Sequence, residues 1–179
     1  MSAQPDAPQG RQQAEARARL AAGQRDLVQA LVAGAPVPAG FDATRVQATA
    51  KALISKRAGE VRAAWPRLAV SLGPDYRRLF GEWAADRPPL GSMVDGYLFA
   101  TALADDGLAG TGSAGSGGLP ALAAGELADV RACLRLTADH HLHRRSALGI
   151  GRSPVASDDG GGTAITYAFR GRILRRRPH

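Results

Sequence analysis

The chain is poor in cysteine, lysine and aromatic residues. Cys133 is the single cysteine among 179 residues, so an internal disulfide, a Cys-x-x-Cys redox pair and a zinc ribbon are all excluded. Residues 1–10 lack the charged start and apolar centre of a secretion signal. No stretch approaches the roughly 18 apolar residues that a membrane helix needs. We expect a cytoplasmic protein that does not enter a membrane.

The net charge of +7 comes almost entirely from arginine, because Lys51 and Lys56 are the only lysines. Alanine and glycine are also abundant, which is typical of a GC-rich coding sequence whatever the function. Except at the C-terminal end, acidic residues are interleaved with the basic ones. The charge alone therefore does not predict a nucleic-acid partner.

No catalytic pattern occurs. The sequence lacks G-x-S-x-G, H-E-x-x-H and a phosphate loop, and no Ser-His-Asp or Cys-His set has a recognisable setting. Glycine-rich runs such as 107–118 have linker composition and do not stand between a strand and a helix. We expect no enzymatic activity, no catalytic residue and no cofactor in this chain.

Apolar residues recur at helical spacing from residue 11 to residue 142. The breaker segment 35–40, Pro66 and the pairs Gly73-Pro74 and Pro88-Pro89 divide this region into separate helices. Asp42 or Thr44 can cap the second helix, and Ser92 with Asp95 resembles a capping box. Helices are predicted over 11–32, 42–65, 67–72, 74–87, from residue 92 towards the linker, and 120–142.

The few aromatic residues are predicted to be core. Tyr76, Leu79, Phe80 and Trp83 follow the i, i+3, i+4, i+7 pattern of one helix face. At such spacing a packed core is more common than a peptide-binding patch, and the same holds for Trp65 and Tyr97. Two interpretations of Arg57 remain open. It is either a buried arginine that ties helices together or part of a partner surface.

Beyond residue 144 the period changes from helical to alternating. Segments 147–152, 163–169 and 172–175 favour strands, separated by glycine-rich turns. Within 163–169 the large residues Ile165, Tyr167 and Phe169 alternate with small ones, which predicts that the large face packs on the helices. The fold class is α+β. We expect a disordered lead-in over 1–10, a helical bundle over 11–142 with a flexible linker at 107–118, and a small β module with an Arg-rich tail over 143–179.

The tract Asp139-His140-His141-Leu142-His143 raises the possibility of a metal site. Only His140 and His143 would share a helix face. We favour a solvated tract at a helix end, where the dipole favours cations, over a metal ligand set. A metal-binding protein built on this tract stays a third alternative.

Residues 56–103 hold a fixed order of signals: a basic pair, an aromatic-Pro step, a Leu-Gly turn, an aromatic helix, a Pro pair and a final Phe-x-x-x-Leu. This order resembles the helical N-terminal domain of partner proteins of multinuclear non-heme iron oxidative enzymes, which modify ribosomally made peptides. The resemblance covers roughly residues 23–142. The residues that carry it are Arg57, Trp65, Pro66, Leu72, Gly73, Phe80, Trp83, Pro88, Pro89, Phe99 and Leu103.

The resemblance implies an adaptor that binds the iron-dependent oxidase and helps recruit its precursor peptide, with the iron in the enzyme. β-Augmentation, in which an extended peptide joins a strand edge, is the physical route for capture. The basic tail is either a solvated edge strand that resists edge pairing or a docking surface for acidic partners. The alternative function is a DNA-binding regulator. The expected peptide- or partner-binding residues are Ile165, Tyr167, Phe169, Arg170, Arg172, Arg175 and Arg176.

Overall fold

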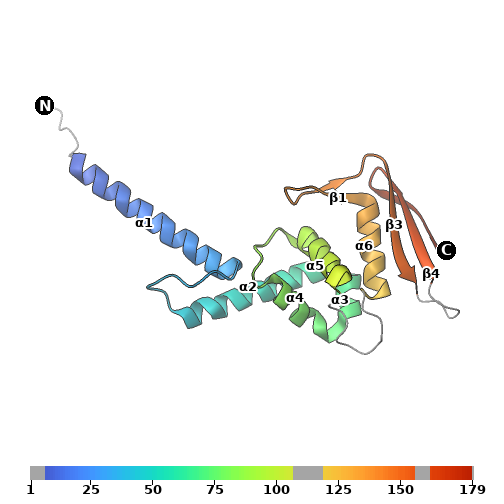
Figure 1. The fold of residues 1–179 in the computed structure, drawn as a ribbon, viewed down its shortest axis with the longest axis horizontal. Helices are drawn as coiled ribbons and strands as arrows, with labels where there is room; N and C mark the ends of the chain where they lie inside the picture. Colours follow the sequence, from blue (N-terminus) through green and yellow to red (C-terminus); the bar gives the residue numbers. More distant parts are fainter. Residues whose placement is uncertain (1–6, 107–118, 156–161, 179) are drawn as a thin grey trace. The chain divides into compact units, whose positions relative to one another are not determined.

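The fold is α+β, with helices followed by small antiparallel sheets (Figure 1). It was obtained as a computed structural model that describes residues 7–106, 119–155 and 162–178. The chain divides into two compact units. One comprises Met1–Ser55 with Ala84–Pro88, and the other comprises Lys56–Trp83 with Pro89–His179.

The first unit contains α1 (Ala7–Val32) and the start of α2 (Ala43–Ala64). Residues 7–10, expected to be disordered, form the first turn of α1. A proline such as Pro8 is tolerated there, because the first helical amides have no partner within the helix. Residues 1–6 lie outside the described residues. Asp42 caps α2, since its Oδ1 accepts hydrogen bonds from the Thr44 and Arg45 amides at 2.9 and 3.2 Å.

The large apolar residues of α1 are only partly buried. Leu27 and Leu31 are half-buried, whereas Leu20 and Val28 are 63% and 51% exposed. α1 therefore keeps large apolar side chains at its surface. The helix ends before Gly34, which adopts a φ of 68°.

Short helices follow in the second unit, with breaks at the expected prolines and glycine. Trp65 is non-helical with a φ of −127°, so Pro66 opens a new helix in the favoured first position. The helices are α3 (Pro66–Leu72), the 3-10 turn η1 (Gly73–Asp75), α4 (Tyr76–Ala84), α5 (Ser92–Asp106) and α6 (Ala121–Cys133).

The aromatic residues form the core of this unit, as predicted. Trp65 and Phe80 are fully buried, and the Phe80 ring lies 5.3 Å from that of Phe99 in an edge-to-face arrangement. Trp83 is half-buried, and its ring contacts both phenylalanines at 5.5 Å. Tyr97 is half-buried beneath the Arg131 guanidinium.

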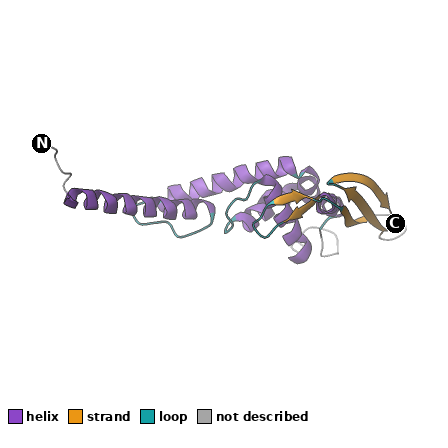
Figure 2. Cartoon of the chain, turned by 90° about the horizontal axis from the view of Figure 1, so that it is seen from above, coloured by secondary structure: helices purple, strands orange, loops and turns teal. Residues whose placement is uncertain are grey.

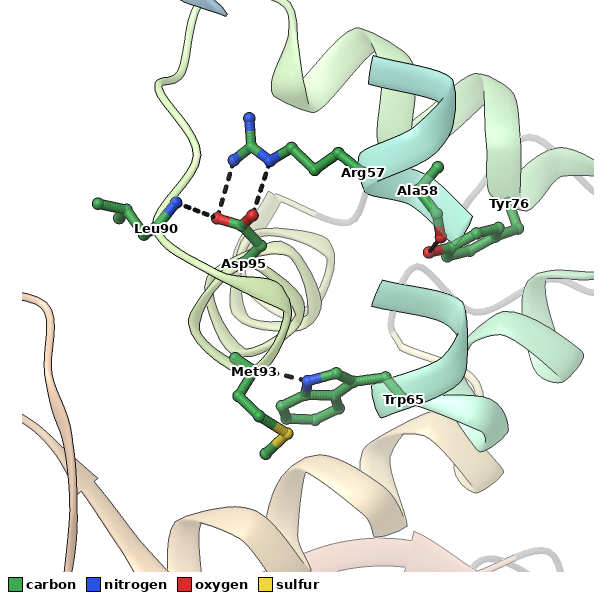
Figure 3. Close-up of polar contacts among 7 residues, drawn as sticks. All are labelled: Arg57, Ala58, Trp65, Tyr76, Leu90, Met93 and Asp95. Carbon is green, nitrogen blue, oxygen red and sulfur yellow. Dashed lines mark hydrogen bonds and ion pairs between the residues drawn. The ribbon is translucent and has the colours of Figure 1, made fainter. Parts of the chain in front are cut away.

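Arg57 and Asp95 form the polar centre of the helices. The Arg57 side chain meets the Asp95 carboxylate at 2.7 and 2.8 Å, and the Leu90 amide donates to Asp95 at 3.1 Å (Figure 3). Asp95 therefore joins α2 to α5, and the expected pairing with Ser92 is replaced by these contacts. Of the two interpretations of Arg57, the structure selects the buried one.

Within the described residues, five strands follow α6 and build two antiparallel sheets. The strands are drawn as arrows in Figures 1 and 2. α6 ends at Cys133, so the predicted helix over 120–142 is too long. The hydrogen bonds of Thr137 with the backbone of His141 favour a turn over a helix there. The strands are β1 (Leu134–Leu136), β2 (Leu142–Arg144), β3 (Leu148–Val155), β4 (Gly162–Phe169) and β5 (Arg172–Pro178), with β1 paired to β2 and the order β3-β4-β5 in the larger sheet.

Candidate functional site

The three-stranded sheet packs against α6 through glycines on β3. A Cβ at Gly149 would come within 1.9 Å of the Ala132 carbonyl oxygen. One at Gly151 would come within 2.1 Å of the Ala128 carbonyl oxygen. The helix backbone therefore rests directly on the strand, and any side chain at these two positions would push them apart.

On β4 the residues that face α6 are also small. Ala164, Thr166 and Ala168 are 4%, 1% and 0% exposed. The Thr166 hydroxyl donates to Oδ1 of Asp129 at 2.7 Å, and the other carboxylate oxygen binds Arg67 at 2.9 Å. One carboxylate on α6 thus fixes both β4 and α3.

The expectation that Ile165, Tyr167 and Phe169 pack on the helices is wrong. Successive strand residues point to opposite faces, so burial of the small residues turns these three large side chains away from α6. The cause is the close approach of helix and sheet, which leaves room only for glycine, alanine, serine and threonine. The small residues, not the large ones, mark the inward face.

The large residues of β3 and β4 instead meet on the opposite side of the sheet. Leu148 lies opposite Phe169, and Ile150 lies opposite Tyr167 in the ladder. Leu148, Ile150 and Phe169 are 57%, 52% and 46% exposed. We call this surface the outer face, and its members are Leu148, Ile150, Ile165, Tyr167 and Phe169.

Arginines lie at the end of the outer face where β4 turns into β5. Arg170 and Gly171 form the turn with φ values of 49° and 70°, as in the tight hairpin turns that match the twist of strands. The Arg170 guanidinium lies 5.5 Å from the centre of the Phe169 ring. Arg172 is exposed and pairs with Phe169 across the ladder. Positive charge thus borders an exposed apolar surface.

Arg175 and Arg176 belong to β5, where their backbones pair with Tyr167 and Thr166. Their side chains lie outside the described residues, so only the strand that carries them is placed. Within the part of the chain that the structure describes, β3 and β5 each pair with β4 alone. Both outer strands therefore have one edge without a described strand partner.

The histidine tract lies in the β1–β2 hairpin, and not at a helix end. The His141 and His143 rings stack at 6.3 Å, and His140 occupies the turn with a φ of 59°. A hydrogen bond from Thr137 lowers the pKa of the exposed Asp139 carboxyl. Across residues 7–106, 119–155 and 162–178, no three His, Cys, Asp or Glu side chains group closely enough to hold a metal ion.

A groove of about 560 Å³ lies on the helices. Its lining includes Pro66, Val70, Arg62 and Arg77. Tyr76 also lines it, and burial raises the pKa of its phenol to about 12.

Within the described residues, no helix combines the length and apolar character that crossing a bilayer requires.

Two comparisons with known proteins each found a match to somewhat less than half of the chain. Residues 21–105 are similar to the family described as SCO6045-like, C-terminal domain. A UPF0276 protein of Streptomyces avermitilis is 46% identical over 82 residues, which are 46% of this chain and 16% of that relative. The chain therefore matches a small part of a much longer protein. No solved structure matches significantly.

The family match ends at residue 105, before α6 and the strands. It includes Arg57, Asp95 and the aromatic core. The outer face and its arginines lie outside it, so what these residues do must be argued from their own geometry.

Proposed function

We propose that this chain is a non-catalytic partner protein that binds an iron-dependent peptide-modifying oxidase and helps recruit the precursor peptide of that enzyme. The outer face is the observation that carries the proposal. This sheet buries its small residues and leaves its large ones exposed or half-buried, which is the reverse of the usual burial of large apolar side chains. Contiguous exposed apolar residues with a polar rim are typical of interaction surfaces.

The sheet supplies both elements that capture of an extended peptide needs. A strand edge offers main-chain hydrogen bonds that depend little on peptide sequence, and a face offers contacts to alternate side chains. On β3 these elements coincide, because the strand has one edge without a described partner and contributes Leu148 and Ile150 to the outer face. Arg170 and Arg172 would attract acidic residues and speed association.

The comparisons show that a segment of this chain recurs within a much longer protein. In the Streptomyces relative, the similar segment is a minor part of the chain and is joined to a much longer remainder. The matched family is described as a C-terminal domain, whereas here the matched residues are followed by α6 and the sheets. A segment that recurs within a much longer protein fits a unit that acts beside a larger partner. In this proposal the iron belongs to the oxidase, and this chain supplies no catalytic group.

The test is co-expression with a candidate iron-dependent oxidase and its precursor peptide, followed by size-exclusion chromatography at low and physiological salt. We expect a complex that survives physiological salt, with peptide oxidation only when the oxidase is present. Binding driven by DNA phosphates falls steeply as salt rises, because each neutralised phosphate adds a counterion-release contribution. Site-selective DNA binding without a co-eluting enzyme would contradict the proposal and favour the DNA-binding alternative.

A further inference from the structure

A small basic pocket of about 180 Å³ lies at the base of the β1–β2 hairpin. Its polar lining consists of arginines, a histidine and a serine, and none of the lining residues is acidic. The lining residues that matter here are Arg135, His143, Arg144, Arg145, Ser146 and Leu148.

The fold holds these basic groups together. Arg135 lies directly opposite His143 in the β1–β2 ladder. The Arg145 amide donates to the Cys133 carbonyl at 2.9 Å, and its Nε donates to the Arg131 carbonyl at the same distance. The end of α6 and the hairpin therefore hold the backbone around the pocket and the Arg145 side chain in place.

Arg135 and Arg144 have no ion-pair partner within the described residues, and both side chains are exposed. Like charges that share one pocket repel each other, and a bound anion would relieve that repulsion. The guanidinium fork matches the two oxygens of a carboxylate, so a single acidic side chain can bind in two-armed geometry.

The pocket is continuous with the outer face. Leu148 lines the pocket and is also the first outer-face residue of β3, opposite Phe169. A ligand that covers the outer face and continues past Leu148 would reach the arginines next. An apolar surface that leads into a basic pocket is complementary to a segment whose apolar residues lead to an acidic one.

We infer that this pocket binds a carboxylate side chain of the captured peptide and so selects precursor peptides with an acidic residue at one end of the bound segment. The inference rests on the proposed function. β3 runs from Leu148, beside the pocket, to Val155. An antiparallel strand added to its edge would therefore end at the pocket, which places the acidic residue at the carboxyl end of that segment.

The experiment measures the affinity of the full chain for the synthetic precursor peptide and for variants in which each Asp or Glu is replaced by Asn or Gln. We expect one replacement to weaken binding roughly tenfold, because a charge-assisted hydrogen-bond pair is lost. Arg135→Gln and Arg144→Gln should weaken binding of the parent peptide similarly. They should have little further effect on that one peptide variant, since a double-mutant cycle isolates paired groups. Arg17→Gln, on exposed α1, is the control for loss of one charge.

The outcomes separate this inference from the proposed function. If the parent peptide binds but no amide replacement and neither arginine variant changes its affinity, the pocket inference is wrong and the proposed function stands. If the arginine variants abolish binding of inorganic phosphate or a DNA duplex while peptide affinity is unchanged, the pocket serves another anion and the inference is again wrong. If the parent peptide does not bind at all, with oxidase present or absent, peptide recruitment and the pocket inference both fall.

Discussion

Arg57 and Asp95 form a two-armed ion pair beneath the aromatic core, with both side chains almost fully buried. The Arg57 guanidinium also lies 5.8 Å from the Phe80 ring centre and 5.5 Å from that of Trp83. Asp95 accepts a further hydrogen bond from the Leu90 amide just before α5. The pair therefore fixes α2 to α5 and shapes the loop between α4 and α5.

Removing one member of this pair should destabilise the fold strongly. Arg57→Met leaves a buried carboxylate without its counter-charge, and we expect a loss of about 3–5 kcal/mol in the free energy of unfolding. Urea denaturation of the variant and the parent measures it. Arg78→Gln, which breaks exposed ion pairs with Asp75 and Glu82, should change the free energy of unfolding far less, because water screens exposed pairs. Equal effects of the two substitutions would contradict the structural role of Arg57.

The spacing of α2 could have predicted the buried arginine. Val46, Leu53, Arg57, Val61 and Trp65 fall on one helical stripe, with Arg57 four residues before Val61. A charged residue within an apolar stripe predicts burial with a partner. Its partner could not be predicted, because Asp95 lies in another helix and resembled a capping residue. Pairing across a long separation depends on tertiary packing, which spacing alone does not reveal.

For the sheet, the sequence predicted the strands but not which of their faces is buried. Alternation correctly predicted strands and placed Ile165, Tyr167 and Phe169 on one face, but it did not reveal which face is buried. The deciding signal was the alternate glycines Gly149 and Gly151 on the neighbouring strand, which allow a helix backbone to approach. The breaks between helices at 35–40, Pro66 and Gly73 were predicted correctly. The end of α6, which has neither proline nor glycine, was predicted too late.

Gly151→Ala should weaken the packing of the sheet on α6, because the new Cβ would meet the Ala128 carbonyl oxygen. The backbone must move to relieve such a clash, so we expect the free energy of unfolding to fall by about 1–3 kcal/mol. Gly59→Ala is the matched control, since this exposed α2 glycine has no atom within 4 Å of an added Cβ. It should stabilise the protein by about 0.5–1 kcal/mol through helix propensity. Denaturation of both variants tests the pair, and stabilisation by Gly151→Ala would refute the close approach.

Tyr76 should keep its proton to unusually high pH. Burial raises the pKa of its phenol from 10.0 to about 12, against the opposing charges of Arg77 and Arg62. Its hydroxyl donates to the Ala58 carbonyl at 2.8 Å, a bond that only the protonated form can make (Figure 3).

The sign of the resulting stability change follows from the raised pKa. The contribution of Tyr76 is complete below pH 10.0 and is lost as pH rises to about 12, because the unfolded phenol ionises first. Subtracting the ultraviolet titration of Tyr76→Phe from that of the parent isolates this residue. We expect a midpoint near 12 or coincident with alkaline unfolding. A midpoint near 10.0 in the folded protein would contradict the burial.

Substitutions on the outer face should separate binding from stability. Ile150→Ser and Phe169→Ser replace side chains that are about half exposed, so each should change the free energy of unfolding by only about 1 kcal/mol. If these residues contact the precursor peptide, affinity should fall roughly tenfold or more in the double variant. Val70→Ser is the control, because Val70 is 71% exposed on α3 and lies outside the sheet. Thermal melting and peptide titration are measured on the same samples. Unchanged affinity with normal melting would exclude the outer face as the peptide surface, whereas loss of both would show that these side chains stabilise the sheet.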